Sequence, residues 1–326
     1  DAVFGGLLTL LRRVYPSPRP DEWWVSTCAE IDVTSAQLNP VLQCLSYARL
    51  LHQRTLESAS WLAPALETAV HIVKTNQSAG LSARPTMDVT TIVNALRMVE
   101  VAARVKAHAA SLLESGVVDA LDYACATGRD IGGHSVPRDA AGAVVALVGK
   151  NEGGRTLSRS TVDAVLGELA LCFDVNHWKG TQSAAKLIPF AQRVATMAVA
   201  DANKKIMVHH GRLLDCLVAG LLLDEGNPRR GQDGADALQE ICAGVLHELA
   251  LYAEGAAVLK QHSRTMDSLR ALAEVGTKES RERAAGALFE LDDAARGAKR
   301  TPMAATSDGR HKPPPHIMMS YNWDHQ

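Results

Sequence analysis

The sequence predicts an all-α fold, a right-handed α-solenoid of about six helical repeats over residues 1–296, followed by a disordered linker and one β-strand. Of the 326 residues, 47% are hydrophobic but only 4% are aromatic. A core made mainly of Ala, Leu and Val suits close helix packing better than a β-sandwich. In addition, a short apolar stretch recurs along the chain, and turn-forming residues separate its copies.

The recurring stretch sets the length of the predicted repeat. Ala243 to Leu249 align with Ala285 to Leu291 at a spacing of 42 residues, and Ala140 to Val144 match Ala284 to Leu288. A period near forty residues is typical of proteins built from stacked pairs or triplets of helices. We therefore expect each copy to close one helical unit.

Apolar residues around these copies recur with helical spacing. From Gly211 to Leu222 apolar pairs return every four residues, which makes one broad apolar stripe on a helix. The next predicted helix has one apolar face, made of Leu238, Ile241, Cys242, Val245 and Leu249. Glycines at 142, 244 and 286 each cost about 1 kcal/mol of helix propensity relative to Ala. We expect close backbone approach between stacked helices to offset this cost.

This pattern resembles the armadillo repeat, in which a short first helix, a second helix opening with Gly and apolar pairs, and a longer third helix form one unit. Glu114 to Leu121 look like another second-helix start. The template places units at about 1–47 (without a first helix), 48–106, 107–152, 153–201, 202–253 and 254–296. HEAT-like geometry stays open toward the N-terminus, where the resemblance weakens, and an irregular helical bundle is the alternative for the whole array.

Loops support this division of the chain. Segments rich in Gly, Pro, Asn and Ser, as chain reversals require, lie at 16–21, 76–85, 128–137, 151–155 and 226–234. Their lengths explain why the units exceed 42 residues.

The helical pattern stops after Arg296. Residues 297–315 are predicted to be a basic, Pro-rich linker that closes with Pro313 to Pro315, because proline cannot continue a helix. His316 to Tyr321 then form an apolar run short enough for a buried strand, and a polar turn follows. A strand followed by a turn is how an α/β domain opens, so residues 316–326 are predicted to be the N-terminal fragment of a second domain.

This last segment resembles the first strand of a TIR (Toll/interleukin-1 receptor) domain, in which Ser is followed by an aromatic residue and shortly by an acidic one. Ser320, Tyr321 and Asp324 fit that pattern. Trp323, His325 and Gln326 resemble the variant in TIR proteins of protists and algae. The resemblance implies TIR–TIR self-association in the full-length protein and, in several lineages, NAD hydrolysis. The family's catalytic Glu lies beyond this strand, so we expect no enzymatic activity and no cofactor here. A tail with chance similarity is the alternative.

Other features argue against several classes of function. Lys plus Arg number 34 against 36 Asp plus Glu, which argues against a nucleic-acid partner, and no apolar run is long enough for a membrane span. His247 and Glu248 begin an HExxH metal motif, but Leu251 stands in place of its second His. The six cysteines lack zinc spacing and are typical of free thiols in a reducing compartment, so a cytoplasmic location is expected.

Four basic residues form one candidate surface for a protein partner. Lys204 and Lys205 are expected to approach Arg229 and Arg230 if their loops share one edge of the array. Together they would make a basic spot for an acidic partner. The alternative is a solvated rim, the usual meaning of such charges.

The third helices form the other candidate surface. Armadillo proteins that hold extended peptides often carry an Asn ladder at the residue before the closing Leu, and here Ala146, Glu248 and Glu290 occupy those positions. This departure argues against nuclear-import-style peptide capture. An acidic groove is expected to prefer a basic segment instead.

The predicted function is that of an armadillo-repeat scaffold for signal transduction. Its concave helical surface is expected to bind proteins and to position or regulate the attached TIR domain. The alternative is the autoinhibitory or sensing portion of a TIR-domain NAD hydrolase whose catalytic part is missing from this sequence. A cargo adaptor unrelated to TIR signalling is a third reading.

Overall fold

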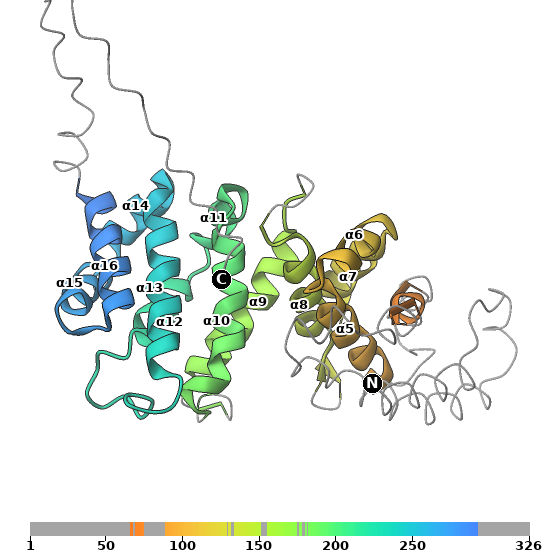
Figure 1. The fold of residues 1–326 in the computed structure, drawn as a ribbon, viewed down its shortest axis with the longest axis horizontal. Helices are drawn as coiled ribbons and strands as arrows, with labels where there is room; N and C mark the ends of the chain where they lie inside the picture. The colour runs from red at the N-terminus through yellow and green to blue at the C-terminus, as the bar shows by residue number, and fades with distance from the viewer. Residues whose placement is uncertain are drawn as a thin grey trace, which may run out of the picture. The chain divides into compact units, whose positions relative to one another are not determined.

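The computed structural model describes residues 66–67, 69–74, 89–128, 130–131, 134–150, 155–174, 176–177, 180 and 182–292, and these residues are mostly helical (Figure 1). A short helical stretch lies within 66–74. The labelled helices are α5 (Val89–Ala103), α6 (Lys106–Glu114), α7 (Val117–Thr127), α8 (Val136–Val148), α9 (Arg159–Phe173), α10 (Ala184–Ala198), α11 (Asp201–Met207), α12 (Leu213–Gly220), α13 (Ala235–Leu251), α14 (Ala253–Gln261), α15 (Thr265–Val275) and α16 (Lys278–Leu291).

A small β-ladder interrupts the helices between α7 and α8. Strands β1 (Asp130–Ile131) and β2 (His134–Ser135) pair antiparallel, with Asp130 opposite Ser135 and Ile131 opposite His134. The sequence predicts only a loop here. Strand β2 leads directly into α8, whose first turn contains Pro137, where the missing backbone N–H has no helical partner to lose.

The long helices and the helices behind them stack in two layers. The long helices α5, α8, α10, α13 and α16 each contact the next one in the series. Helices α7, α9, α12 and α15 form a second series, again with each in contact with the next. Successive units therefore bury one continuous core between two rows of helices, which is the arrangement of an α-solenoid.

For the units predicted at 107–152, 202–253 and 254–296, the boundaries agree with the helices to within a few residues. The unit at 1–47 and most of the unit at 48–106 lie outside the described residues. Helices α6 to α8, α11 to α13 and α14 to α16 each form a unit of three helices. In the unit predicted at 153–201 the described residues form the helices α9 and α10, and residues 155–158 are not helical. Ser158 caps α9 by accepting the N–H of Thr161 with its side chain, and both residues also donate to Asp122 of α7.

The helix predicted from 211 to 222 is shorter than its apolar pattern. Helix α12 ends at Gly220, and Leu222 adopts a left-handed backbone with φ of 53°. A left-handed residue cannot continue a right-handed helix. The paired residues from Leu213 to Leu222 are nevertheless buried, so the pattern correctly identifies the core and only the helix end differs.

The core is made of small and aliphatic side chains. On α13 the predicted apolar face is confirmed, because Leu238, Cys242, Val245 and Leu249 are buried and Ile241 packs against them half-buried. Within the described residues no single helix has the length and hydropathy that a membrane crossing needs. Helices α13 and α14 meet those criteria as a pair, but a bend of 117° separates them.

Chain contacts divide the molecule after Leu291, five residues before the predicted end of the helical region. The linker at 297–315 and the TIR-like segment with Ser320, Tyr321, Trp323 and Asp324 lie outside the described residues. So does the predicted unit at 1–47. These parts of the prediction stay predictions.

Candidate binding surface on the third helices

The row of long helices presents one face of the array. We call the surface formed by α5, α8, α10, α13 and α16 the third-helix face, because α8, α13 and α16 are the third helices of the three-helix units and α5 and α10 lie in the same row. Charged side chains on this face form two groups. One group spans α5, α8 and α10, and the other spans α11, α13 and α16.

Arg193 of α10 reaches across α8 to Glu100 of α5. Its Nη2 lies 2.8 and 2.9 Å from the two carboxylate oxygens of Glu100. The side chain passes over Gly142 of α8, where a Cβ atom would lie 2.6 Å from that nitrogen. Glycine at 142 thus leaves room for a side chain that joins three helices. The predicted close approach is found at this glycine, but it involves a side chain and not a backbone.

Three more ion pairs surround this bridge. They are Arg104 Nη2 to Glu100 Oε1 at 3.2 Å, Arg97 Nε to Asp139 Oδ1 at 3.3 Å, and Arg138 Nη1 to Glu168 Oε2 at 2.8 Å. The last pair ties α8 to α9 of the second layer. Charges in this part of the face are therefore largely satisfied within the chain.

Two carboxyl groups near Arg193 have pKa values that are shifted in opposite directions. Burial tends to raise the pKa of Glu100, but the charge and hydrogen bonds of Arg193, with those of Arg104, outweigh burial and hold the pKa below its usual range. Burial raises the pKa of Asp139, and Arg97 and Arg193 offset only part of that effect. Glu100 is thus the firmly ionised partner of Arg193.

Glu248 of α13 is compensated by a buried lysine. Lys204 of α11 has only 4% of its side chain exposed, and its Nζ lies 3.3 Å from Glu248 Oε2 and 3.0 Å from Asp201 Oδ1. One ammonium group thus serves two carboxylates. The pair lies near the C-terminal end of α13, where the helix dipole already favours a cation.

His247 fills the space beside another glycine. A Cβ atom at Gly286 of α16 would lie 2.8 Å from Nε2 of His247 on α13, so this glycine again leaves room for a side chain of the neighbouring third helix. Burial lowers the pKa of His247, while Glu248 and Glu290 act in the opposite direction. At Gly244 an added Cβ would meet nothing within 4 Å, so the expected close approach is absent there.

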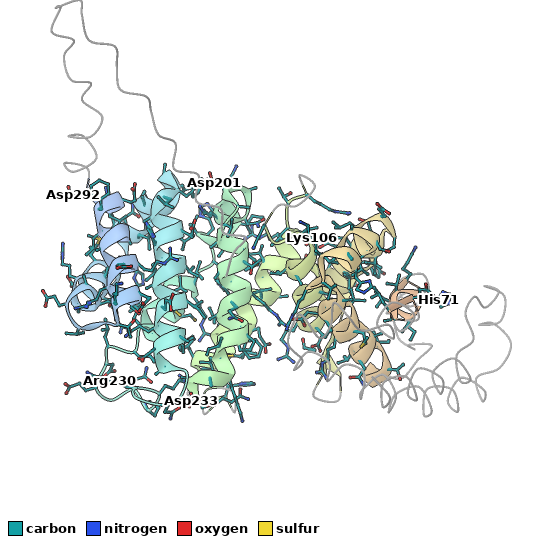
Figure 2. All side chains as sticks on the ribbon, in the orientation of Figure 1. His71, Lys106, Asp201, Arg230, Asp233 and Asp292 are labelled. Atoms are coloured by element: carbon teal, nitrogen blue, oxygen red, sulfur yellow. The ribbon has the colours of Figure 1, made fainter. Side chains whose placement is uncertain are left out.

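The structure does not bring the four predicted basic residues together. Lys204 and Lys205 belong to α11, whose first residue Asp201 lies at one edge of the array, and Arg230 lies at the opposite edge (Figure 2). The four residues therefore do not form a basic surface. Lys204 and Arg229 make buried contacts, and Lys205 and Arg230 are exposed to solvent.

Arg229 holds the loop before α10. Its guanidinium donates to the carbonyl oxygens of Cys172 at 2.8 Å and Gln182 at 3.0 Å, and also to that of Gly180. The guanidinium carbon lies 5.4 Å from the ring centroid of Phe173. Arg229 is a structural residue, and its position in a Gly/Pro-rich loop gave no sign of this.

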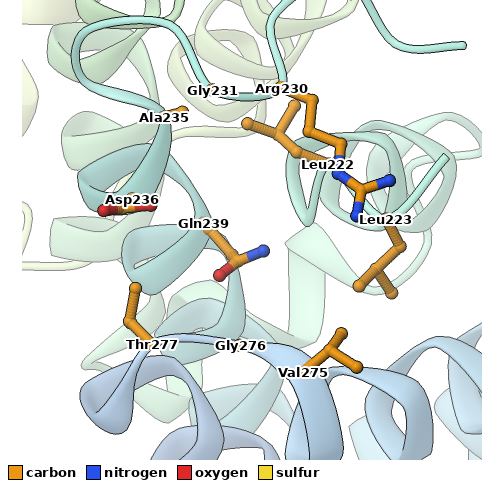
Figure 3. A pocket seen from close by; sticks show the side chains of 10 residues that line it. All are labelled: Leu222, Leu223, Arg230, Gly231, Ala235, Asp236, Gln239, Val275, Gly276 and Thr277. Carbon is orange, nitrogen blue, oxygen red and sulfur yellow. The ribbon is translucent and has the colours of Figure 1, made fainter. Parts of the chain in front are cut away.

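A hollow of about 320 Å³ lies at the edge of the last two units, between the end of α12, the start of α13 and the turn from α15 to α16 (Figure 3). In that view Asp236 and Thr277 lie on one side, and Arg230 with Leu223 on the other. Gln239 donates from Nε2 to the Leu221 carbonyl at 2.6 Å. The hollow is lined by the acidic Asp236, the basic Arg230 and apolar side chains such as Leu223. Its charges therefore favour neither an anion nor a cation.

The described cysteines and the described metal-ligating residue types form neither an activated thiol nor a metal site. The four described cysteines are free and buried, and burial raises the pKa of Cys125 and Cys242 to about 12 and that of Cys216 to about 11. Such thiols stay protonated and are poor nucleophiles. No group of three His, Cys, Asp or Glu residues within the described ranges is arranged to hold a metal ion.

Sequence reasoning located Glu248 and Glu290 on the third helices but missed Glu100 and Arg193. These two residues are 93 positions apart, and no local pattern connects them. One signal was present, namely Gly142 within an apolar helix. It showed that something must approach α8 closely without showing what.

Comparisons with solved structures find the same kind of fold. A designed armadillo repeat protein superposes with a TM-score of 0.53 at 15% identity, over 88% of this chain and 100% of that one. A second designed armadillo repeat protein, in complex with the peptide (KR)4, gives 0.51 at 14% identity, over 88% and 99%. An engineered protein gives 0.51 at 16% identity, over 89% and 96%. No protein-family model and no curated protein matches the chain. The fold is an armadillo-like α-solenoid.

Proposed function

We propose that this protein is a protein-binding scaffold whose third-helix face receives an extended segment of a partner. The observation that carries the proposal is the unbroken row of third helices, in which each helix contacts the next. Stacked repeats of this kind offer a long surface with a regular spacing of side chains. The designed armadillo repeat protein with bound (KR)4 supports this function, because it has the same fold.

Among the described residues the cysteines are free and buried, and no three His, Cys, Asp or Glu side chains are arranged to hold a metal ion. We propose a binding role for this chain and no catalytic activity of its own. The same proposal places the protein in the cytoplasm, because the described cysteines are free thiols and thiols stay reduced there.

Selection of peptides from a random-sequence library against the chain tests the scaffold proposal. Thr196 lies near the end of α10 and close to Gly149 at the end of α8, so Thr196→Arg places a bulky charge between two third helices. Ala271→Arg places the same side chain at an exposed site on α15. Selected peptides should lose affinity for Thr196→Arg and keep it for Ala271→Arg. No enrichment of any peptide, or equal losses for the two variants, would contradict the proposal.

The finer function we propose is control of an attached TIR domain in signal transduction. It is motivated by the Pro-rich stretch at 313–315 and by the strand-like run with Ser320, Tyr321 and Asp324 that follows. In that arrangement the helical array recruits the partner and TIR–TIR self-association transmits the signal. An autoinhibitory or sensing role in an NAD hydrolase is the second candidate, and it requires a catalytic Glu downstream of Gln326.

Two measurements separate these TIR-dependent functions. Reading the downstream sequence shows whether an α/β pattern with that Glu continues after residue 326. Incubating the full-length protein with NAD then distinguishes an enzyme from an adaptor. A downstream sequence without further strand–helix alternation would exclude both functions and favour a cargo adaptor.

A further inference from the structure

A carboxylate recurs near the C-terminal end of three third helices, and in two of them the chain supplies its counter-ion. Glu100 of α5 binds Arg193, and Glu248 of α13 binds Lys204. Glu290 of α16 forms neither an ion pair nor a hydrogen bond within the part of the chain that the structure describes. The last unit thus has the carboxylate without the cation.

Equivalent backbone positions in the last two units explain this difference. Lys204 N donates to Ala200 O at 3.0 Å at the start of α11, and Ala256 N donates to Tyr252 O at 2.8 Å at the start of α14. Lys204 and Ala256 therefore occupy the same place in their first helices. Since Ala256 carries no charge, the unit that contains Glu290 has no equivalent of the buried lysine.

Glu290 lies where a bound segment would pass. It is four residues after Gly286, so both lie on one side of α16, and Gly286 packs against His247 of α13. Glu290 is also near enough to His247 to act on the pKa of that imidazole, as Glu248, Arg283 and Lys204 do. Glu290 is also half-buried near the negative end of the α16 dipole, where an unpaired carboxylate is unfavourable.

We infer that a bound partner segment supplies the missing cation, with a Lys or Arg side chain at Glu290. This rests on the proposed function, because it names the chemistry of the partner at the third-helix face. Packed helices lie about 8–10 Å apart and an extended chain rises about 3.3 Å per residue. A second basic side chain three residues away then reaches Glu248, which shares Lys204 with Asp201. The preferred partner has basic residues at i and i+3.

Binding of labelled peptides to the intact chain tests this inference. The probe is fluorescein-labelled (Lys-Ser-Ser)4, with (Glu-Ser-Ser)4, (Gln-Ser-Ser)4 and a peptide that has four adjacent lysines and eight serines as comparisons. Anisotropy is measured with the native chain, with Glu290→Gln, and with Glu274→Gln. The last variant makes the same change of charge at an exposed site on α15.

The native chain should prefer (Lys-Ser-Ser)4 to the other three peptides. Glu290→Gln should weaken its binding roughly 3- to 10-fold, because one charge-assisted contact is lost. Glu274→Gln should leave the affinity unchanged, and added salt should weaken binding to the native chain more than binding to Glu290→Gln.

The inference is overturned if Glu290→Gln and Glu274→Gln weaken binding alike, or if the acidic or neutral peptide binds as tightly as (Lys-Ser-Ser)4. If peptides from the random library bind and remain sensitive to Thr196→Arg, such a result leaves the scaffold proposal intact. Failure of the scaffold proposal is distinguishable, because then no peptide of any charge binds the third-helix face.

Discussion

Arg193 shows how one side chain joins three helices of the array. Its guanidinium connects α10 to Glu100 of α5 over Gly142 of α8, with most of the ion pair removed from water. Removing one partner of such an ion pair leaves an uncompensated charge in a poorly solvated place. The resulting loss of stability is larger than the net stability that the pair contributes. The register of the third helices therefore depends on this contact.

Removal of Arg193 should destabilise the fold strongly. For Arg193→Met we expect a loss of about 3 kcal/mol in the free energy of unfolding, because among the described residues Glu100 then keeps only Arg104 as an ion-pair partner. Urea denaturation measures the loss. The double variant Arg193→Met/Glu100→Met should recover part of it, and a double variant no more stable than the single one would contradict the ion-pair explanation.

The lowered pKa of Glu100 also predicts a dependence on pH. The folded-state pKa lies below the ordinary value of 4.5, so the stability from this group is fully present above pH 4.5 and is lost as pH falls through the folded pKa. Asp139, with its raised pKa, acts in the opposite direction. The difference in unfolding free energy between the native chain and Glu100→Gln should therefore shrink as pH falls from 6 to 3. A difference that does not vary with pH would refute the assignment.

The three glycines predicted to cost helix stability should respond differently to alanine. Gly244→Ala should raise the unfolding free energy by about 1 kcal/mol, because the new Cβ meets nothing within 4 Å. Gly142→Ala and Gly286→Ala should bring no such gain, since Arg193 and His247 occupy the space. Thermal unfolding of the three variants checks this order. Equal gains at all three positions would show that these side chains move aside freely.

At the level of elements, the sequence predicts the helices better than their ends and their connections. Apolar spacing and glycine position identified α12, α13 and α16 because these signals are local. The early end of α12 depends on the backbone of Leu222. The non-helical form of residues 155–158 depends on how they meet α7 and α11. Contacts of that kind arise only when units stack, so a single unit's sequence does not display them.

The adjacent residues Arg229 and Arg230 allow a matched test of how the loop before α10 is held in place. Arg229→Lys removes the planar donor set that binds three carbonyl oxygens, while Arg230→Lys changes an exposed side chain. Hydrogen exchange should become faster in the loop before α10 and in the first turn of α10 for Arg229→Lys only. Equal exchange in the two variants would contradict the structural role given to Arg229.

Across the whole molecule, stability should be distributed unit by unit. In a stacked array each unit contacts mainly its neighbours, so local damage spreads only a short distance. Gly286→Leu overpacks the seam with His247 and should cost about 1–3 kcal/mol. Hydrogen exchange should rise in α13 to α16 and stay unchanged in α5 to α8. Uniform acceleration along the array would indicate a single cooperative core instead.

The central claim is that the third-helix face is where the array binds a partner. The measurement that tests it most directly is hydrogen exchange of the chain with and without a peptide selected from the random library. The account predicts protection concentrated in the C-terminal turns of α10, α13 and α16, with α9, α12 and α15 unaffected. Protection on the second-layer helices, or around the hollow between α12 and α15, would contradict it.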